Sequence, residues 1–149
     1  MTYETARAQI VTLVQSATPT ILEHGMPSTF IEAPDASDDN LPRSRSFWLF
    51  GVRDVVRVPL SSTRRRVVTL DLVIAYELLA NRKALDRVLR SDHKAVGDAL
   101  LDPSTWDRPT SGIVSVEQAG GALILEATID DALEGFVLHR YTFDLEYLS

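Results

Sequence analysis

The chain of 149 residues is acidic and lacks cysteine: 21 Asp and Glu against 15 Lys and Arg give a formal net charge of −6. The lack of cysteine excludes disulfides and zinc sites with thiolate ligands. With 45% hydrophobic and 24% charged residues, the composition predicts one globular domain. No apolar run approaches the roughly 18 residues that cross a bilayer, and the start shows no secretory pattern, so we expect a soluble protein made in a cytoplasm.

The N-terminal part of the chain predicts one helix followed by a loop-rich stretch. Apolar residues recur at helical spacing across residues 3–16, and Thr2 is placed to cap the start of that helix. Pro19 then ends the helical pattern. Residues 24–46 are rich in Pro, Ser, Asp and Asn, which favours a loop around one short strand near Phe30.

Two β-rich segments come next. The segment "FWLFGVRDVVRVPL", residues 47–60, ends at Pro59 and holds Gly51 as a bend. The run from Val67 to Leu78 alternates between a wholly apolar side and a mixed side, which predicts a strand with one face on a core. The apolar side consists of Val68, Leu70, Leu72, Ile74, Tyr76 and Leu78.

The middle of the chain predicts a second amphipathic helix. In "NRKALDRVLRSDHKAVGDALLDP", residues 81–103, Asn81 can cap the helix and Pro103 can end it. Apolar residues form a stripe along this segment. Because Asp92 interrupts the stripe, the pattern allows a kink or two shorter helices at that point.

The last third of the chain is β-rich. Residues 113–129 contain two adjacent glycines at 120–121, which predict either a tight turn or a bulge that restarts one long strand, and we favour the bulge. Residues 130–135 form a turn, and residues 136–148 alternate as a final strand. The resulting order is α-β-β-α-β-β. We therefore expect an α+β domain, a mostly antiparallel β-sheet packed on one face by an N-terminal helix and a central helix.

Motifs that carry catalysis or ligand binding are absent from the sequence. It contains no phosphate-binding Gly-x-x-x-x-Gly-Lys-Ser/Thr loop and no Gly-x-Ser-x-Gly nucleophile elbow. His24, His93 and His139 are far apart in sequence, which predicts one loop, one helix-surface and one strand histidine rather than a metal site. The acidic pairs at 38–39 and 130–131 lack the spacing of a calcium loop and fit turns. We expect no enzyme activity, no cofactor and no metal.

The charge is distributed unevenly. Between Arg43 and Arg66 there are seven arginines against one acid, Asp54, whereas the remainder holds eight basic residues against twenty acids. Patches of opposite sign favour association between unlike surfaces, including two copies of one chain. A solvated loop and a nucleic-acid contact remain open, although the acidic total disfavours nucleic acid. Trp48 lies in an apolar run typical of a core or interface, and Trp106 either anchors a loop or contacts a partner.

Five segments, in this order, cover most of the chain: "ARAQIVTLVQ", "RRRVVTLDLVIAYEL", "KALDRVLRSDHKAVGDAL", "GIVSVEQAGGALILEATI" and "FVLHRYTFDLEYL". This series resembles the tail-terminator (tail-completion, minor tail protein U-like) proteins of long-tailed bacteriophages. The resemblance implies a structural virion protein at the head–tail junction, a homo-oligomer that forms a hexameric ring. Such a ring halts polymerisation of the major tail tube protein and docks the head completion (connector) protein. DNA passes through its bore without sequence-specific binding, and neither catalysis nor a membrane is involved.

A ring of identical copies joins two unlike surfaces of one chain. The hypothesis is that the arginine segment of one copy meets the acidic last turn of the next. The expected interface residues are Arg53, Arg57, Arg64, Arg65, Arg66, Asp130, Asp131, Glu134, Trp48 and Trp106. The alternatives are another head–tail connector, such as a stopper or adaptor, and a small nucleic-acid-binding regulator.

Overall fold

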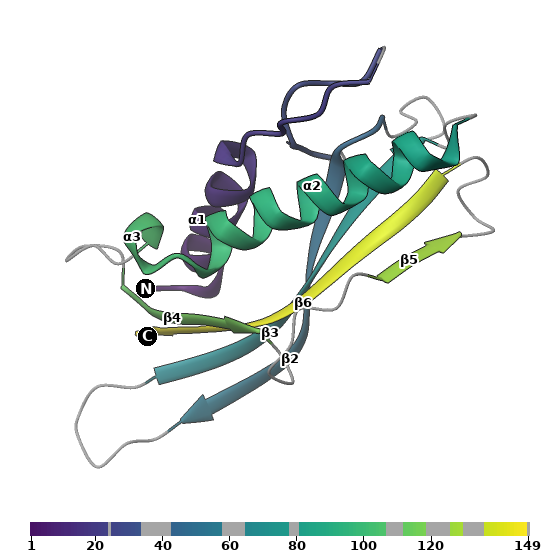
Figure 1. Ribbon diagram of the computed structural model, residues 1–149. Coiled ribbons are helices and arrows are strands. Elements are labelled where there is room, and N and C mark those ends of the chain that lie inside the picture. The colour runs from purple at the N-terminus through teal and green to yellow at the C-terminus, as the bar shows by residue number, and fades with distance from the viewer. Residues whose placement is uncertain are drawn as a thin grey trace.

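The computed structural model describes residues 1–23, 25–33, 43–57, 65–77, 81–106, 112–118, 126–129 and 136–148. In these residues a twisted sheet carries its helices on one face (Figure 1). We call the opposite side of the sheet the outer face. No helix of the described residues covers the outer face.

Three helices occur in the described residues: α1 (Tyr3–Ser16), α2 (Arg82–Leu101) and the short α3 (Pro103–Trp106). The two predicted caps are confirmed. The Thr2 hydroxyl accepts a hydrogen bond from the backbone amide of Thr5 at 3.2 Å. The Asn81 side chain accepts hydrogen bonds from two amides of the first turn of α2, at 3.1 and 3.3 Å. These acceptors satisfy amides that a helix start leaves without an intrahelical partner.

The described strands form one sheet in the spatial order β1-β2-β3-β6-β4, and β5 also pairs with β6. Only the contact between β1 and β2 is parallel, and the other strand pairs are antiparallel. Both β4 and β5 lie along the edge of β6 that β3 leaves open. The strands are β1 (Ile31–Glu32), β2 (Ser46–Arg57), β3 (Arg65–Glu77), β4 (Ile113–Gln118), β5 (Glu126–Ile129) and β6 (Phe136–Leu148).

The α+β class with a mostly antiparallel sheet is confirmed, but the element order is not the predicted one. The described residues run α-β-β-β-α-α-β-β-β. The segment after Phe30 pairs with β2 as β1, where the Ala33 amide donates to the Phe47 carbonyl at 2.8 Å. Pro103 ends α2 as expected but also starts α3, because proline suits the first position of a helix. The glycines at 120–121 lie outside the described residues, so the choice between turn and bulge there stays a prediction.

The core lies between the sheet and the helices. The predicted alternation of β3 and β6 is observed, and the inward residues of both strands are buried. They pack with the buried faces of α1 and α2 in one apolar cluster. Each large apolar side chain buried in this way contributes about 1.5–3 kcal/mol. The largest fully buried apolar and aromatic side chains are Tyr76, Tyr141, Tyr147, Phe30, Phe47, Phe143, Ile10, Leu70, Leu72, Ile74 and Leu100.

The two shorter helices that the pattern allows at Asp92 do not form, since α2 is one helix from Arg82 to Leu101. Asp92 is buried and its carboxylate accepts two hydrogen bonds from the Arg45 guanidinium, at 2.8 and 3.0 Å. The Tyr76 hydroxyl donates a third at 2.8 Å. These partners offset the cost of removing a charge from water, so a carboxylate can occupy the apolar stripe without ending the helix.

Arg45 also fixes the loop-rich segment to the rest of the domain. Its guanidinium donates to the carbonyl oxygens of Pro27 at 2.8 Å and Ile21 at 2.6 Å. Its own amide donates to the Ala75 carbonyl at 2.8 Å, and its φ of 68° lies in the left-handed region. One side chain therefore joins the loop before β1, the start of β2 and the middle of α2.

Candidate subunit interface

Three of the predicted interface arginines lie on the last part of β2 and the first part of β3. We call residues 53–57 and 65–68 the hairpin end. The register places Arg53 opposite Thr69 and Arg65 opposite Arg57, so Arg53 and Arg65 lie on the outer face several positions apart, whereas Arg66 points to the other face. Their side chains reach solvent, with 50% of Arg65 and 41% of Arg66 exposed. The hairpin end is therefore a positively charged, accessible tip of the sheet.

The arginines of the hairpin end are held only weakly within the chain. Arg65 lies 3.6 Å from Glu146, and Arg66 lies 3.5 Å from Asp54. Both nitrogen–oxygen distances exceed the roughly 2.7–2.9 Å of a strong charge-assisted hydrogen bond. Exposed pairs of this kind contribute about 0–1 kcal/mol, and Arg53 forms no ion pair with any described residue. The three guanidinium groups can therefore bind carboxylates of a partner at little cost to the fold.

A hollow of about 390 Å³ lies beside the hairpin end, where the start of α1 meets β2. Its lining includes Tyr3, Asp54 and Val68, together with the β-bulge at Gly51 and Val52 that realises the predicted bend. A Cβ atom on Gly51 would lie 3.1 Å from the Tyr3 hydroxyl oxygen, so the glycine lets this tyrosine approach the strand. Burial raises the pKa of Tyr3, which stays neutral at physiological pH. This hollow can accept an apolar side chain flanked by a charged group.

The centre of the outer face is polar and already hydrogen-bonded. Thr69 donates to Asp144 and Thr142 donates to Asp71, each at 2.6 Å, between residues directly opposite each other on β3 and β6. Arg140 lies 3.9 Å from Asp71. These cross-strand pairs stabilise the sheet and leave an overall acidic strip of surface.

An apolar strip on β2 borders the polar centre of the outer face. Trp48 is half-buried opposite Val73, while Phe50 is 52% exposed and Val52 is 56% exposed. Exposed aromatic and aliphatic side chains beside arginines are typical of the composition of protein–protein interfaces. The predicted interface residue Trp48 therefore lies on the same face of the sheet as Arg53 and Arg65.

The remaining predicted interface residues are less accessible or lie outside the described residues. Trp106 is buried, and its indole Nε1 donates to the Leu100 carbonyl at 3.1 Å, so it anchors α3 against α2. The backbone of Arg57 belongs to β2, but its side chain is not described. Arg64, Asp130, Asp131 and Glu134 lie outside the described residues. The acidic half of the hypothesis thus stays a prediction.

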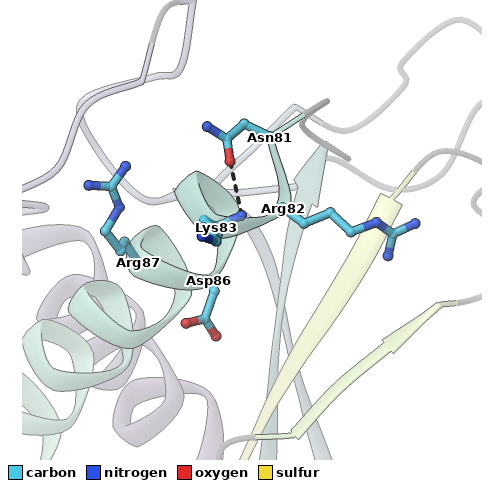
Figure 2. A pocket seen from close by; sticks show the side chains of 5 residues that line it. All are labelled: Asn81, Arg82, Lys83, Asp86 and Arg87. Carbon is cyan, nitrogen blue, oxygen red and sulfur yellow. Dashed lines mark hydrogen bonds between the residues drawn. The ribbon is translucent and has the colours of Figure 1, made fainter.

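A second basic surface, which the sequence interpretation missed, lies along α2. The exposed residues Arg82, Lys83 and Arg87 surround a hollow of about 610 Å³ at the start of the helix, together with Asn81 and Asp86 (Figure 2). The Arg82 and Arg87 side chains point to opposite sides in that view, so the cations do not converge on one point. Counting basic residues at helical spacing over 82–94 would have found this surface.

Two histidines expected to be separate are in contact. His93 of α2 and His139 of β6 place Nδ1 and Nε2 3.2 Å apart. His93 lies on a helix and His139 on a strand, as expected, but His93 is only partly exposed. Tyr141 stacks on the His93 ring at a centroid distance of 5.0 Å and lies tilted against the His139 ring at 4.4 Å. The contact joins residues 46 positions apart and has no signature in local sequence.

The hydrogen bond between the two imidazoles indicates which nitrogen carries the proton. His139 is fully buried and its Nδ1 has no hydrogen-bond partner among the described residues. If His139 Nε2 donates to His93 Nδ1, then His139 Nδ1 carries no proton and is an acceptor without a donor. If His93 Nδ1 donates instead, His139 carries its proton on Nδ1, and that buried N–H has no acceptor. Since orphaned buried N–H groups are rarer than orphaned acceptors, we assign His139 as the donor.

Comparison with known protein families and with curated proteins gives no match to this chain. Within the described residues, no group of three or more His, Asp or Glu side chains is arranged to hold a metal ion. No helix in that part of the chain has both the length and the apolarity that a bilayer span requires. The hairpin end, the apolar strip on β2 and the basic surface of α2 are therefore the candidate binding surfaces of the described residues.

Proposed function

We propose that this protein is a structural virion protein that assembles with copies of itself into a ring and caps the tail tube of a bacteriophage. The observation that supports this best is the hairpin end. Three exposed arginines lie there, Arg53 and Arg65 on the outer face and Arg66 on the other face, their ion pairs within the chain are long or missing, and β2 adds an apolar strip and part of a hollow. Such a surface suits a partner that supplies carboxylates and an apolar anchor.

The proposed ring is head-to-tail, because cyclic assemblies join two different surfaces of each copy. In it, the hairpin end of one copy meets an acidic surface of the next. A hexamer of this kind would sit on the last layer of the major tail tube protein, stop its polymerisation and dock the head completion protein. DNA would pass through the bore, and the protein would catalyse no reaction.

Two alternatives differ from this in partner. Another head–tail connector, such as a stopper or adaptor, would use the same kind of ring contact on a different neighbour. The cations along α2 favour a nucleic-acid-binding regulator, because such side chains bind phosphate groups as readily as carboxylates. A steep loss of DNA affinity with rising salt concentration would support the nucleic-acid-binding regulator.

Native mass spectrometry and negative-stain imaging of the chain, with and without tail tube protein, test the proposal. We expect closed rings that cap tubes and shorten them. The triple variant Arg53→Glu, Arg65→Glu and Arg66→Glu should lose rings while its circular dichroism stays that of the wild type. The matched control reverses three cations of α2, Arg82→Glu, Lys83→Glu and Arg87→Glu, and should keep rings. Tubes left uncapped by the wild-type chain would overturn the proposed function; rings that survive the first variant would overturn the role of the hairpin end.

A further inference from the structure

The middle of α2 is attached to the sheet by two adjacent polar contacts. Asp92 binds Arg45 and Tyr76 through its carboxylate, and the next residue, His93, binds His139. The first contact joins opposite charges. The second joins two neutral rings, of which His139 is fully buried, so a charge on that ring would lie away from water.

Among the side chains that the structure describes, none around the histidine pair compensates a positive charge. From β6, the neutral Tyr141 ring covers both imidazoles. From β3, the apolar residue Ile74 lies opposite His139 in register, and from β5, Ala127 lies opposite its other side. From α2, the Asp92 carboxylate is occupied by Arg45 and Tyr76. No carboxylate of the described residues is within ion-pair distance of either imidazole.

Protonation of either ring destabilises the closed arrangement. A proton on His93 Nδ1 would face the N–H of His139, unless His139 moves its own proton to Nδ1, where the buried N–H has no acceptor. A proton on His139 would leave the contact between the rings in place but would put a charge and a second N–H in a fully buried position where Nδ1 has no acceptor. Protonation of His139 therefore costs the desolvation of an unpaired buried charge, and protonation of the partly exposed His93 costs the hydrogen bond of the present tautomers.

We propose that the histidine pair is an acid-sensitive latch, which holds α2 on β6 while both rings are neutral and releases the helix when either ring is protonated. This goes beyond the proposed ring and does not depend on it. A release of α2 would expose the inner face of the sheet, because the helix covers the buried sides of β3 and β6.

The direction of the pH dependence follows from the two states. Burial, and then the neighbouring His93, lower the pKa of His139 to about 3, and burial also lowers the pKa of His93. In the released state both return towards about 6.5. The released state therefore binds more protons below pH 6.5, so the closed latch is fully stable above that pH and loses stability between pH 6.5 and 3. If release of α2 is accompanied by the uptake of one proton, the equilibrium constant for release rises about 30-fold between pH 7.5 and 5.0.

Hydrogen exchange of the α2 amides at pH 7.5 and 5.0, corrected for the intrinsic exchange rate, tests the latch in the full chain. We expect protection of α2 to fall by about 30-fold or more over this range. The variant His93→Gln, which keeps hydrogen-bonding groups but does not titrate, leaves only His139 to titrate and should limit the change to about 30-fold, below that of the wild type. The matched control His24→Gln should leave the wild-type change intact. Equal pH dependence in wild type and His93→Gln would overturn the proposal.

A second measurement avoids substitution altogether. Imidazole resonances of the wild-type protein, followed from pH 8 to 5, should show that the pKa values of His93 and His139 both lie below the ordinary value of about 6.5. Ordinary titration of both residues would contradict the latch.

Discussion

Replacing Asp92 with asparagine removes one charge from the most deeply buried polar network of the domain. The carboxylate accepts hydrogen bonds from Arg45 Nε at 2.8 Å, Arg45 Nη2 at 3.0 Å and the Tyr76 hydroxyl at 2.8 Å, and both charged side chains are fully buried. In Asp92→Asn the guanidinium stays in place without its counter-charge. Breaking a buried pair by removing one partner costs about 3–5 kcal/mol. A domain of this size has a total stability of about 5–15 kcal/mol, so we expect a folded but much weakened protein.

Urea unfolding followed by tryptophan fluorescence and circular dichroism measures this loss as a change in the free energy of unfolding. The matched control is Asp98→Asn on the same helix, whose side chain is 70% exposed and lies 3.3 Å from Lys94. We expect the control to lose less than about 0.5 kcal/mol. Tyr76→Phe, which removes one of the three hydrogen bonds, should cost about 1.5–3 kcal/mol. A loss for Asp92→Asn that is no larger than that of the control would refute the assignment of this network as a main stabilising contact.

Three further substitutions test other parts of the fold. Asn81→Ala removes the cap of α2 and should cost about 1 kcal/mol, with helical signal lost first on heating. Trp106→Phe removes the hydrogen bond to Leu100 and should cost about 0.5–1.5 kcal/mol in urea unfolding; unchanged stability would mean that packing alone anchors α3. Thr142→Val leaves Asp71 without its 2.6 Å donor and should cost about 1.5–3 kcal/mol, whereas no change in melting temperature would exclude a stabilising role for the cross-strand pair.

Local pattern in the sequence was sufficient for much of the fold. The alternation of β3 and β6 identified the inward residues, because side chains of a strand point to opposite faces in turn. Thr2 and Asn81 identified the starts of α1 and α2, since short polar side chains satisfy the free amides of a helix start. Both signals depend only on neighbours within a few positions.

Contacts between distant residues were beyond this kind of pattern. The irregular position of Asp92 in its helical stripe was visible, but its partner Arg45 lies 47 positions away. The same reason hid the contact of His93 with His139, which exists only because α2 lies across β6. Counting charge by segment also placed Arg45 with surface arginines, although it is fully buried, because composition does not distinguish an inward from an outward side chain.

The irregular margin of β2 has a consequence for solubility. Past the short contact with β1, this strand has no further neighbour on its far side among the described residues. The bulge between Gly51 and Arg53 breaks the regular spacing of its backbone groups, and Arg7 donates to the Leu49 carbonyl at 3.2 Å. Bulges and charged side chains prevent an edge strand from pairing with a strand of another molecule, which would otherwise start a fibril. The margin of β2 is thereby protected from open-ended amyloid-like growth.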